Sequence, residues 1–145
     1  MLIGRHELAM LIPHAGAMCL LDGVREWDET HIRCQAHTHR DPDNPMRRFG
    51  RLHAVCGIEY VSQAMAAHAA LANAGRECSR KGYLASVRNF ALAVARLDTI
   101  QGDLDIEAEK IVAEGERALY DFRISAQGQV LMTGRAAAVF EVTTP

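Results

Sequence analysis

The sequence comprises 145 residues with a mass of 16.0 kDa, which is the size of one ordinary domain. Its hydrophobic fraction of 49% and charged fraction of 23% are typical of a soluble globular protein, and a net charge of −2 disfavours a wholly basic nucleic-acid-binding protein. No apolar run approaches the length of a transmembrane helix, and the N-terminus lacks the basic and apolar regions of a signal peptide. We therefore expect a cytoplasmic protein with no membrane span and no nucleic-acid partner.

The first third of the chain predicts one short helix, two strands and a loop. Residues 5–12 are expected to form the helix, which Pro13 ends because the residue before a proline is disfavoured in the α region. Residues 17–27 and the alternating residues 31–39 are predicted to be the antiparallel strands of a hairpin. The segment 41–52 holds two of the four prolines and is predicted to be a loop.

The most distinctive segment, residues 53–75, predicts a long buried helix. It is rich in alanine, and Gly75 is a natural C-terminal stop. Between His53 and Ala74 the only acidic residue is Glu59, and neither lysine nor arginine occurs there. A helix that is apolar nearly all round is typical of a protein interior.

Four strands are expected after this helix, at residues 83–96, 104–114, 117–126 and 129–142. Short turns between them favour antiparallel pairing. One buried helix with strands on both sides of it in the sequence suggests a sheet wrapped around that helix. We therefore predict an α+β fold in which residues 1–145 form a single domain.

Glu59 is the first candidate functional residue, because an isolated carboxylate is rarely buried in a protein interior. At helical spacing it shares a face with small or partly polar side chains that would let a ligand or a second chain approach: Cys56, Gln63, Ala66 and Ala70. Loss of water around a glutamate raises its pKa and suits it to donate a proton at neutral pH. An ion pair with an arginine explains this residue equally well.

His14 is the second candidate. It follows Pro13 in a tight turn, and loops on rigid scaffolds often hold catalytic groups. A solvated or structural role for His14 stays open on this reasoning. His53 is the second choice for the catalytic histidine. His68 faces away from Glu59 and is predicted to be a packed core histidine.

A metal site is not expected. His31, His37 and His39 fall on one face of their predicted strand, whereas Cys34 falls on the other. The cysteines form no Cys-x-x-Cys pair and have no base at a fixed spacing, so we expect neither a disulfide framework nor a cysteine nucleophile. The four cysteines are Cys19, Cys34, Cys56 and Cys78.

Three arginines lie close together in the loop before the long helix: Arg47, Arg48 and Arg51, here called the arginine cluster. A solvated loop would explain them. A docking patch for an acidic partner or for a phosphate would explain them as well.

Three segments resemble FabZ-type 3-hydroxyacyl-acyl-carrier-protein dehydratases in order and spacing. LIPHAGAMCLLDGV at residues 11–24 resembles the Pro-His segment with which that family opens. GIEYVSQAMAA at residues 57–67 resembles its central helix, in which a catalytic glutamate is followed four residues later by glutamine. GDLDIEAE at residues 102–109 resembles its Gly-Asp-x-Leu turn. HAGAMCLLD with GIEYVSQA is similar to a FabZ-like branch associated with aryl polyene biosynthesis clusters.

The resemblance implies a hotdog fold, in which an antiparallel sheet wraps around one long helix. It implies a dehydratase acting on a 3-hydroxyacyl thioester that is carried by the phosphopantetheine of acyl carrier protein, with no metal or redox cofactor. It also implies a homodimer, or a heterodimer with a related hotdog subunit. His14 of one subunit would be the base and Glu59 of the other the acid, with Gln63 orienting Glu59. The arginine cluster would meet the acidic carrier protein.

The family pattern changes before Glu59, where His53-Ala54-Val55 stands in place of the usual Pro-Gly-Val. In the family, the glycine N–H helps to hold the thioester carbonyl, and glycine permits a close approach of the backbone. The corresponding donors here would be the N–H groups of Ala54, Val55 and Cys56. They lie at the N-terminus of the long helix, where they would stabilise enolate charge.

Two other functions stay open on this sequence. A hotdog thioesterase would use the buried carboxylate to activate water at the same thioester, although the Pro13-His14 segment favours dehydration. A non-catalytic subunit would bind acyl carriers or complete a heterodimer with a related dehydratase. A DNA-binding regulator of this fold is disfavoured because the sequence has no helix-turn-helix segment.

Overall fold

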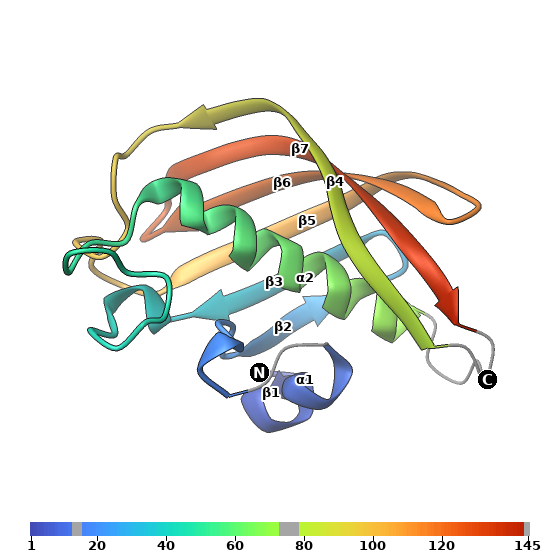
Figure 1. Ribbon diagram of the computed structural model, residues 1–145, viewed down its shortest axis with the longest axis horizontal. Helices are drawn as coiled ribbons and strands as arrows, with labels where there is room; N and C mark the ends of the chain where they lie inside the picture. Colours follow the sequence, from blue (N-terminus) through green and yellow to red (C-terminus); the bar gives the residue numbers. More distant parts are fainter. Residues whose placement is uncertain (13–15, 73–78, 144–145) are drawn as a thin grey trace.

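The computed structural model describes residues 1–12, 16–72 and 79–143 (Figure 1). The strands in this part of the chain are β1 (Ile3–Gly4), β2 (Gly23–Trp27), β3 (His31–Ala36), β4 (Ser79–Leu92), β5 (Leu104–Glu114), β6 (Arg117–Ala126) and β7 (Gln129–Thr143). The α-helices are α1 (Arg5–Leu11) and α2 (Gly57–Ala72), and short 3₁₀ helices span Gly16–Met18, Thr38–Arg40 and Ala54–Cys56.

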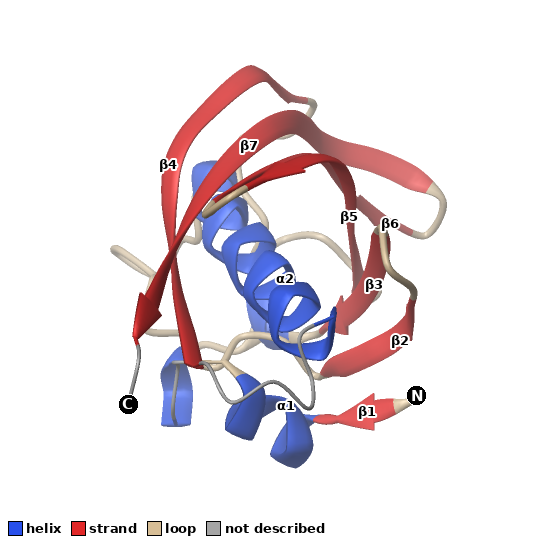
Figure 2. Ribbon diagram, turned by 90° about the vertical axis from the view of Figure 1, so that its right-hand side faces the viewer, coloured by secondary structure: helices blue, strands red, loops and turns tan. Residues whose placement is uncertain are grey.

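These strands form one antiparallel sheet of seven strands in the order β1-β2-β3-β5-β6-β7-β4. The sheet curls around α2, and α1 packs beside β1 and the helix (Figures 1 and 2). β1 and β4 are the two edge strands. This is the arrangement that the resemblance implied, an antiparallel sheet wrapped around one long helix.

Alternation along the strands decides which side chains enter the core. In β3, Ile32, Cys34 and Ala36 are fully buried, as the sequence pattern predicts, whereas the residues between them are half-buried. β6 buries Tyr120 and Ile124 in the same way. The buried side chains of both strands belong to one hydrophobic cluster together with residues of α2, so a single core lies between the helix and the inner side of the sheet.

The α2 side that packs against the sheet is fully buried. Val61 and Ala64 are at most 1% exposed, and His68 is 0% exposed. One ring nitrogen of His68 lies 2.7 Å from the hydroxyl oxygen of Tyr120, and the other lies 2.9 Å from the carbonyl oxygen of Asp28. Burial lowers the pKa of His68. The prediction of a packed core histidine is confirmed.

The opposite side of α2 is half-buried. Cys56 before the helix and Glu59, Ala66 and Ala70 along it all keep part of their surface in solvent. Gln63 on the same side is fully buried, because it bonds to a neighbouring segment. The prediction of a helix buried all round is therefore correct for one side only. The small side chains on the other side leave room for a further molecule to approach.

Two predicted strands are shorter than expected. Residues 17–22 lie outside β2, because the side chain of Gln63 rather than a sheet neighbour bonds to the backbone of Met18 and Leu20. β3 ends at Ala36 because the following residues form a 3₁₀ helix. In that helix, the hydroxyl of Thr38 donates a hydrogen bond of 2.6 Å to the carbonyl oxygen of Leu20.

The remaining boundaries follow the predictions more closely. The long helix begins at Gly57 rather than at residue 53, since residues 54–56 form a 3₁₀ helix before it. Its predicted stop at Gly75 lies outside the described residues. β4 lies four residues earlier than predicted, and β5, β6 and β7 agree to within one residue. Within the described ranges, no helix is long and apolar enough to cross a membrane.

Candidate active site

Glu59 lies in the first turn of α2, on the half-buried side of the helix. The positive end of the helix dipole is located there and stabilises a carboxylate. Oε1 of Glu59 accepts a hydrogen bond of 3.4 Å from Nε2 of Gln63, one turn further along the helix. The acidic side chain is therefore held beside the helix start, on the side that other molecules can reach.

Gln63 connects this helix to the segment that follows His14. Its Oε1 accepts the N–H of Leu20 at 2.9 Å, and its Nε2 donates to the carbonyl oxygen of Met18 at 2.7 Å. His14 itself lies outside the described residues. The structure thus holds the chain just beyond His14 within one helical turn of Glu59.

The three backbone donors at the start of α2 are not equally available. The N–H of Ala54 donates to the carbonyl oxygen of Ala95 at 3.0 Å, and that of Cys56 donates to the carbonyl oxygen of His53 at 3.0 Å. Among the described residues, no acceptor binds the N–H of Val55, whose side chain is 52% exposed. Of the three predicted donors, Val55 is the one whose N–H has no acceptor among the described residues.

An ion pair fixes the segment that leads into α2. Asp98 accepts hydrogen bonds from the guanidinium of Arg96 and, at 2.9 Å, from the N–H of Leu52. The Arg96 bond keeps the pKa of the Asp98 carboxyl well below its usual range. Leu97 in turn donates its N–H to the carbonyl oxygen of Leu52 at 2.8 Å. In the sequence, the only signal for this pair is two opposite charges two positions apart, which does not predict it.

The cysteine thiols are suited to packing rather than to nucleophilic attack. Burial raises the pKa of Cys56, and the nearby charge of Arg48 offsets only part of that rise. Burial also raises the pKa of Cys19, and it raises that of Cys34 to about 12. Cys78 lies outside the described residues. Because the thiolate is the reactive form, these shifts disfavour cysteine chemistry at neutral pH.

The arginine cluster divides into one half-buried and two exposed side chains. Arg47 is half-buried, and its guanidinium donates to the carbonyl oxygens of Gly50 at 3.0 Å and His39 at 3.2 Å. Arg48 and Arg51 are exposed, and their backbones bond to each other in both directions at 2.9 and 3.0 Å. Arg47 thus braces the loop, and the other two remain as surface cations.

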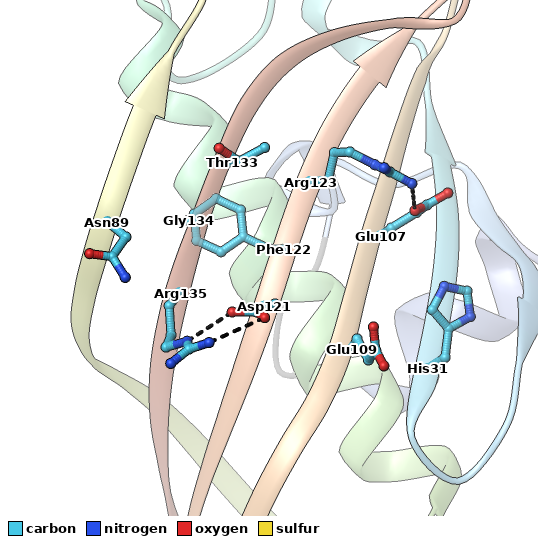
Figure 3. Close-up of a pocket in the computed structure, with 10 residues that line it drawn as sticks. All are labelled: His31, Asn89, Glu107, Glu109, Asp121, Phe122, Arg123, Thr133, Gly134 and Arg135. Carbon is cyan, nitrogen blue, oxygen red and sulfur yellow. Dashed lines mark hydrogen bonds and ion pairs between the residues drawn. The ribbon is translucent and has the colours of Figure 1, made fainter.

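The three histidines that were predicted to share one strand face are separated. His31 lies on the outer face of the sheet (Figure 3). Nδ1 of His37 is 2.6 Å from a carboxylate oxygen of Asp22. His39 is fully buried, with Nε2 3.0 Å from the carbonyl oxygen of Ile100, so its predicted place on a solvated strand face is wrong. The described part of the chain contains no group of three residues arranged to hold a metal ion.

A hollow of about 420 Å³ lies on the outer face of the sheet, away from α2 (Figure 3). Its walls carry paired charges. Arg123 contacts Glu107 at 2.6 Å, and Arg135 contacts Asp121 at 2.9 Å. An apolar acyl chain would have to displace water from these ion pairs, which is unfavourable. We therefore assign the candidate site to the α2 side of the sheet.

Solved structures define the class of the fold. A chain of the dehydratase heterocomplex ApeI:P from Xenorhabdus doucetiae matches with a TM-score of 0.81 and 25% identity, over 92% of this chain and 90% of that one. A thioesterase from Haemophilus influenzae matches with a TM-score of 0.67 and 14% identity, over 95% and 90% of the two chains. A mutant thioesterase from Pseudomonas aeruginosa matches with a TM-score of 0.62 and 14% identity, over 85% and 82%. The two thioesterases show the fold alone. The protein has the hotdog fold, as the resemblance implied.

The family model for ApeP-like proteins, described as ApeP dehydratase, matches residues 6–144. The chain therefore belongs to the ApeP-like dehydratase family, the branch that the two sequence motifs indicated. The comparison with curated protein sequences returns no match.

Proposed function

We propose that this chain removes water from a 3-hydroxyacyl thioester, carried on the phosphopantetheine of an acyl carrier protein, to give the trans-2-enoyl thioester. Membership of a dehydratase family supports the reaction class. The observation that carries the proposal is the half-buried carboxylate of Glu59 in the first turn of α2, to which Gln63 donates a hydrogen bond. Elimination of water needs a base and an acid at one place, and we assign these roles to His14 and Glu59.

In the proposed reaction, His14 takes the proton from C2 of the substrate. The electrons of that C–H bond first move into the enolate, where charge develops on the thioester oxygen, and they form the new double bond between C2 and C3 when the C3–O bond breaks. The N–H of Val55, at the N-terminal end of α2, would stabilise this charge. Glu59 gives its proton to the C3 hydroxyl, which leaves as water when the C3–O bond breaks. Gln63 orients Glu59 through its amide, and the scheme uses no cofactor.

We also propose that the working unit is a dimer, in which His14 of one subunit serves Glu59 of the other. The half-buried side of α2 supports this proposal, because its small side chains would let a second chain approach. The partner subunit would be a second copy or a related hotdog chain. The likeness to a chain of a dehydratase heterocomplex favours the related chain.

A second candidate function is that of a non-catalytic subunit in such a heterodimer. The N–H of Ala54 is already bonded to Ala95, and Ala54 stands where the family's carbonyl-holding glycine is found. A chain with one donor fewer would bind the carrier and support a partner that performs the chemistry.

The test is turnover of a 3-hydroxyacyl carrier-protein thioester, followed by mass spectrometry, with the purified chain alone and with a co-purified hotdog partner. His14→Ala and Glu59→Gln are measured beside the wild type. Glu109→Gln is the matched control, because Glu109 is an exposed carboxylate on the outer face of the sheet. We expect the wild type and the control to remove 18 mass units, the mass of one water, and both site variants to leave the thioester intact.

Two results would overturn this proposal. Release of free acid would identify a thioesterase. Turnover that needs the partner and is unaffected by both site variants would identify the non-catalytic subunit. In that case, the chemistry would belong to the partner chain.

A further inference from the structure

Phe49 is an exposed aromatic side chain with no role in the fold. It is 102% exposed, more than any other large hydrophobic residue in the described part of the chain. It stands between Arg48 and Arg51, separated from the latter only by Gly50. Phe49 was not among the residues predicted for the docking patch, although the arginines on both sides of it were.

The backbone at Phe49 is held in a conformation that its side chain disfavours. Phe49 has φ +52° and Gly50 has φ +74°, and the two hydrogen bonds between Arg48 and Arg51 close a two-residue hairpin around them. Such turns favour asparagine, aspartate or glycine at the first central position, and a bulky residue with positive φ is an outlier. Strain kept at an exposed position points to a functional role rather than a structural one.

The hairpin is braced, so Phe49 is presented in a defined position. The guanidinium of Arg47 donates to the carbonyl oxygens of Gly50 and His39, and Asn44 donates from its side chain to the hydroxyl of Tyr60 at 3.1 Å. Tyr60 belongs to α2. The loop is therefore anchored to the helix that carries Glu59. A preorganised loop loses little conformational entropy when a partner binds.

The hairpin lies at the rim of the candidate site. The chain runs from Arg51 through Leu52 directly into the start of α2, and this loop adjoins the N-terminal end of the helix (Figure 1). The charge of Arg48 is close enough to act on the thiol of Cys56. A molecule seated on the hairpin would thus stand next to the exposed Val55 and to the first turn of α2.

We propose that Phe49, flanked by the guanidinium groups of Arg48 and Arg51, is the apolar anchor by which this protein docks an acidic acyl carrier protein. The inference rests on the proposed function and names the surface that delivers its substrate. Phe49 enters an apolar depression on the carrier, and the two arginines bind surrounding carboxylates. Aromatic and arginine side chains are the residue types that most often dominate binding energy at protein interfaces. A second copy of this chain, with a net charge of only −2, offers less charge complementarity to the two cations.

The test is the variant Phe49→Asn, because asparagine suits the turn and removes the anchor. We expect the midpoint of thermal unfolding to rise and the Kd for a purified holo acyl carrier protein to increase at least about tenfold. Arg48→Glu should also increase the Kd, and the increase should be larger at low salt, where surface charges are screened less. In both variants, the ratio of kcat/KM for the carrier-bound substrate to that for its N-acetylcysteamine thioester should fall as the Kd rises.

Val112→Thr is the matched control. Val112 is an apolar residue that is 49% exposed, on β5 eight residues beyond Leu104. Leu104 at the start of β5 pairs with Ala36 at the end of β3, after which the loop with Phe49 begins. Val112 lies roughly 26 Å from Leu104 along β5, and therefore far from that end of the sheet. We expect it to bind holo-carrier with the Kd of the wild type.

Two results would overturn the inference. One is a Phe49→Asn variant that binds holo-carrier as tightly as the wild type. The other is a Phe49→Asn variant that loses its oligomeric state in analytical ultracentrifugation, which would make the hairpin a contact between subunits. Failure of the proposed function would look different, because carrier binding would still depend on Phe49 while no thioester lost water.

Discussion

The two sides of α2 differ in burial, and we propose that only the less buried side takes part in the reaction. The side that faces the sheet carries Tyr60, Val61 and Ala64, whose burial makes the core, and its histidine, His68, is bonded on both ring nitrogens. The other side carries Glu59, which keeps part of its surface exposed beside a buried amide. One helix therefore bears two kinds of constraint, and changes on its two sides should have separable effects.

The largest effect is expected from Glu59→Gln. The amide has almost the same shape but cannot donate a carboxylic proton, so kcat should fall by about a thousandfold. The free energy of unfolding should change by less than about 1 kcal/mol, because the side chain lies outside the core. Steady-state kinetics measure the change in kcat, and urea unfolding measures the change in the free energy of unfolding. A fall in stability that matches the fall in activity would place Glu59 with the core residues instead.

The next largest effect concerns which chains form a site. If two copies of this chain pair and His14 of one copy serves Glu59 of the other, mixing His14→Ala with Glu59→Gln chains creates dimers with one intact site. Random exchange should then restore about a quarter of the wild-type activity. Activity is measured after subunit exchange, which native mass spectrometry verifies. Mixed dimers without activity would mean that both groups act within one chain.

On the core side, His68→Ala should lower the free energy of unfolding by about 3 kcal/mol. The change leaves a cavity and removes the partners of the Tyr120 hydroxyl and the Asp28 carbonyl. Urea denaturation measures the loss. His37→Ala, at a histidine with a side chain 55% exposed, is the control and should stay close to the wild type. Equal losses in the two variants would contradict the assignment of His68 to the core.

The smallest effect is the pH dependence of stability. Burial lowers the pKa of His68 and of His39 below the ordinary value of 6.5. As pH falls through that value, the unfolded chain binds protons that the folded chain does not, so the free energy of unfolding decreases. Urea midpoints measured between about pH 7.5 and pH 5.5 should show this decrease. His68→Gln should flatten it, and a wild-type stability that rises over the same interval would refute the assignment.

Much of the fold follows from local patterns in the sequence. Strict alternation predicts the buried residues of β3, and the short turns predict the bounds of β5 and β6. The absence of charge around Glu59 marks both the long helix and its exceptional residue. These features repeat with the period of a helix or strand, so they can be recognised in the sequence without knowledge of the tertiary contacts.

The sequence alone proposes the residues of the candidate site, whereas their connections come only from the tertiary structure. Glu59, His14 and Gln63 stand out in the sequence, and the family match agrees with the motifs that contain them. The sequence also points equally to Ala54, Val55 and Cys56 as backbone donors. Only packing shows that Ala54 is bonded to Ala95, because that bond joins segments about forty residues apart.

By itself, the sequence determined the long helix, the strand alternation, the candidate acid and base, and the family to which the chain belongs. The tertiary structure decided which backbone groups Gln63 binds, which arginine braces the loop, and that Phe49 points into solvent. The physical reason is that periodicity is a property of neighbours along the chain. A hydrogen bond from Gln63 to Met18 instead depends on how two segments 45 residues apart pack against each other.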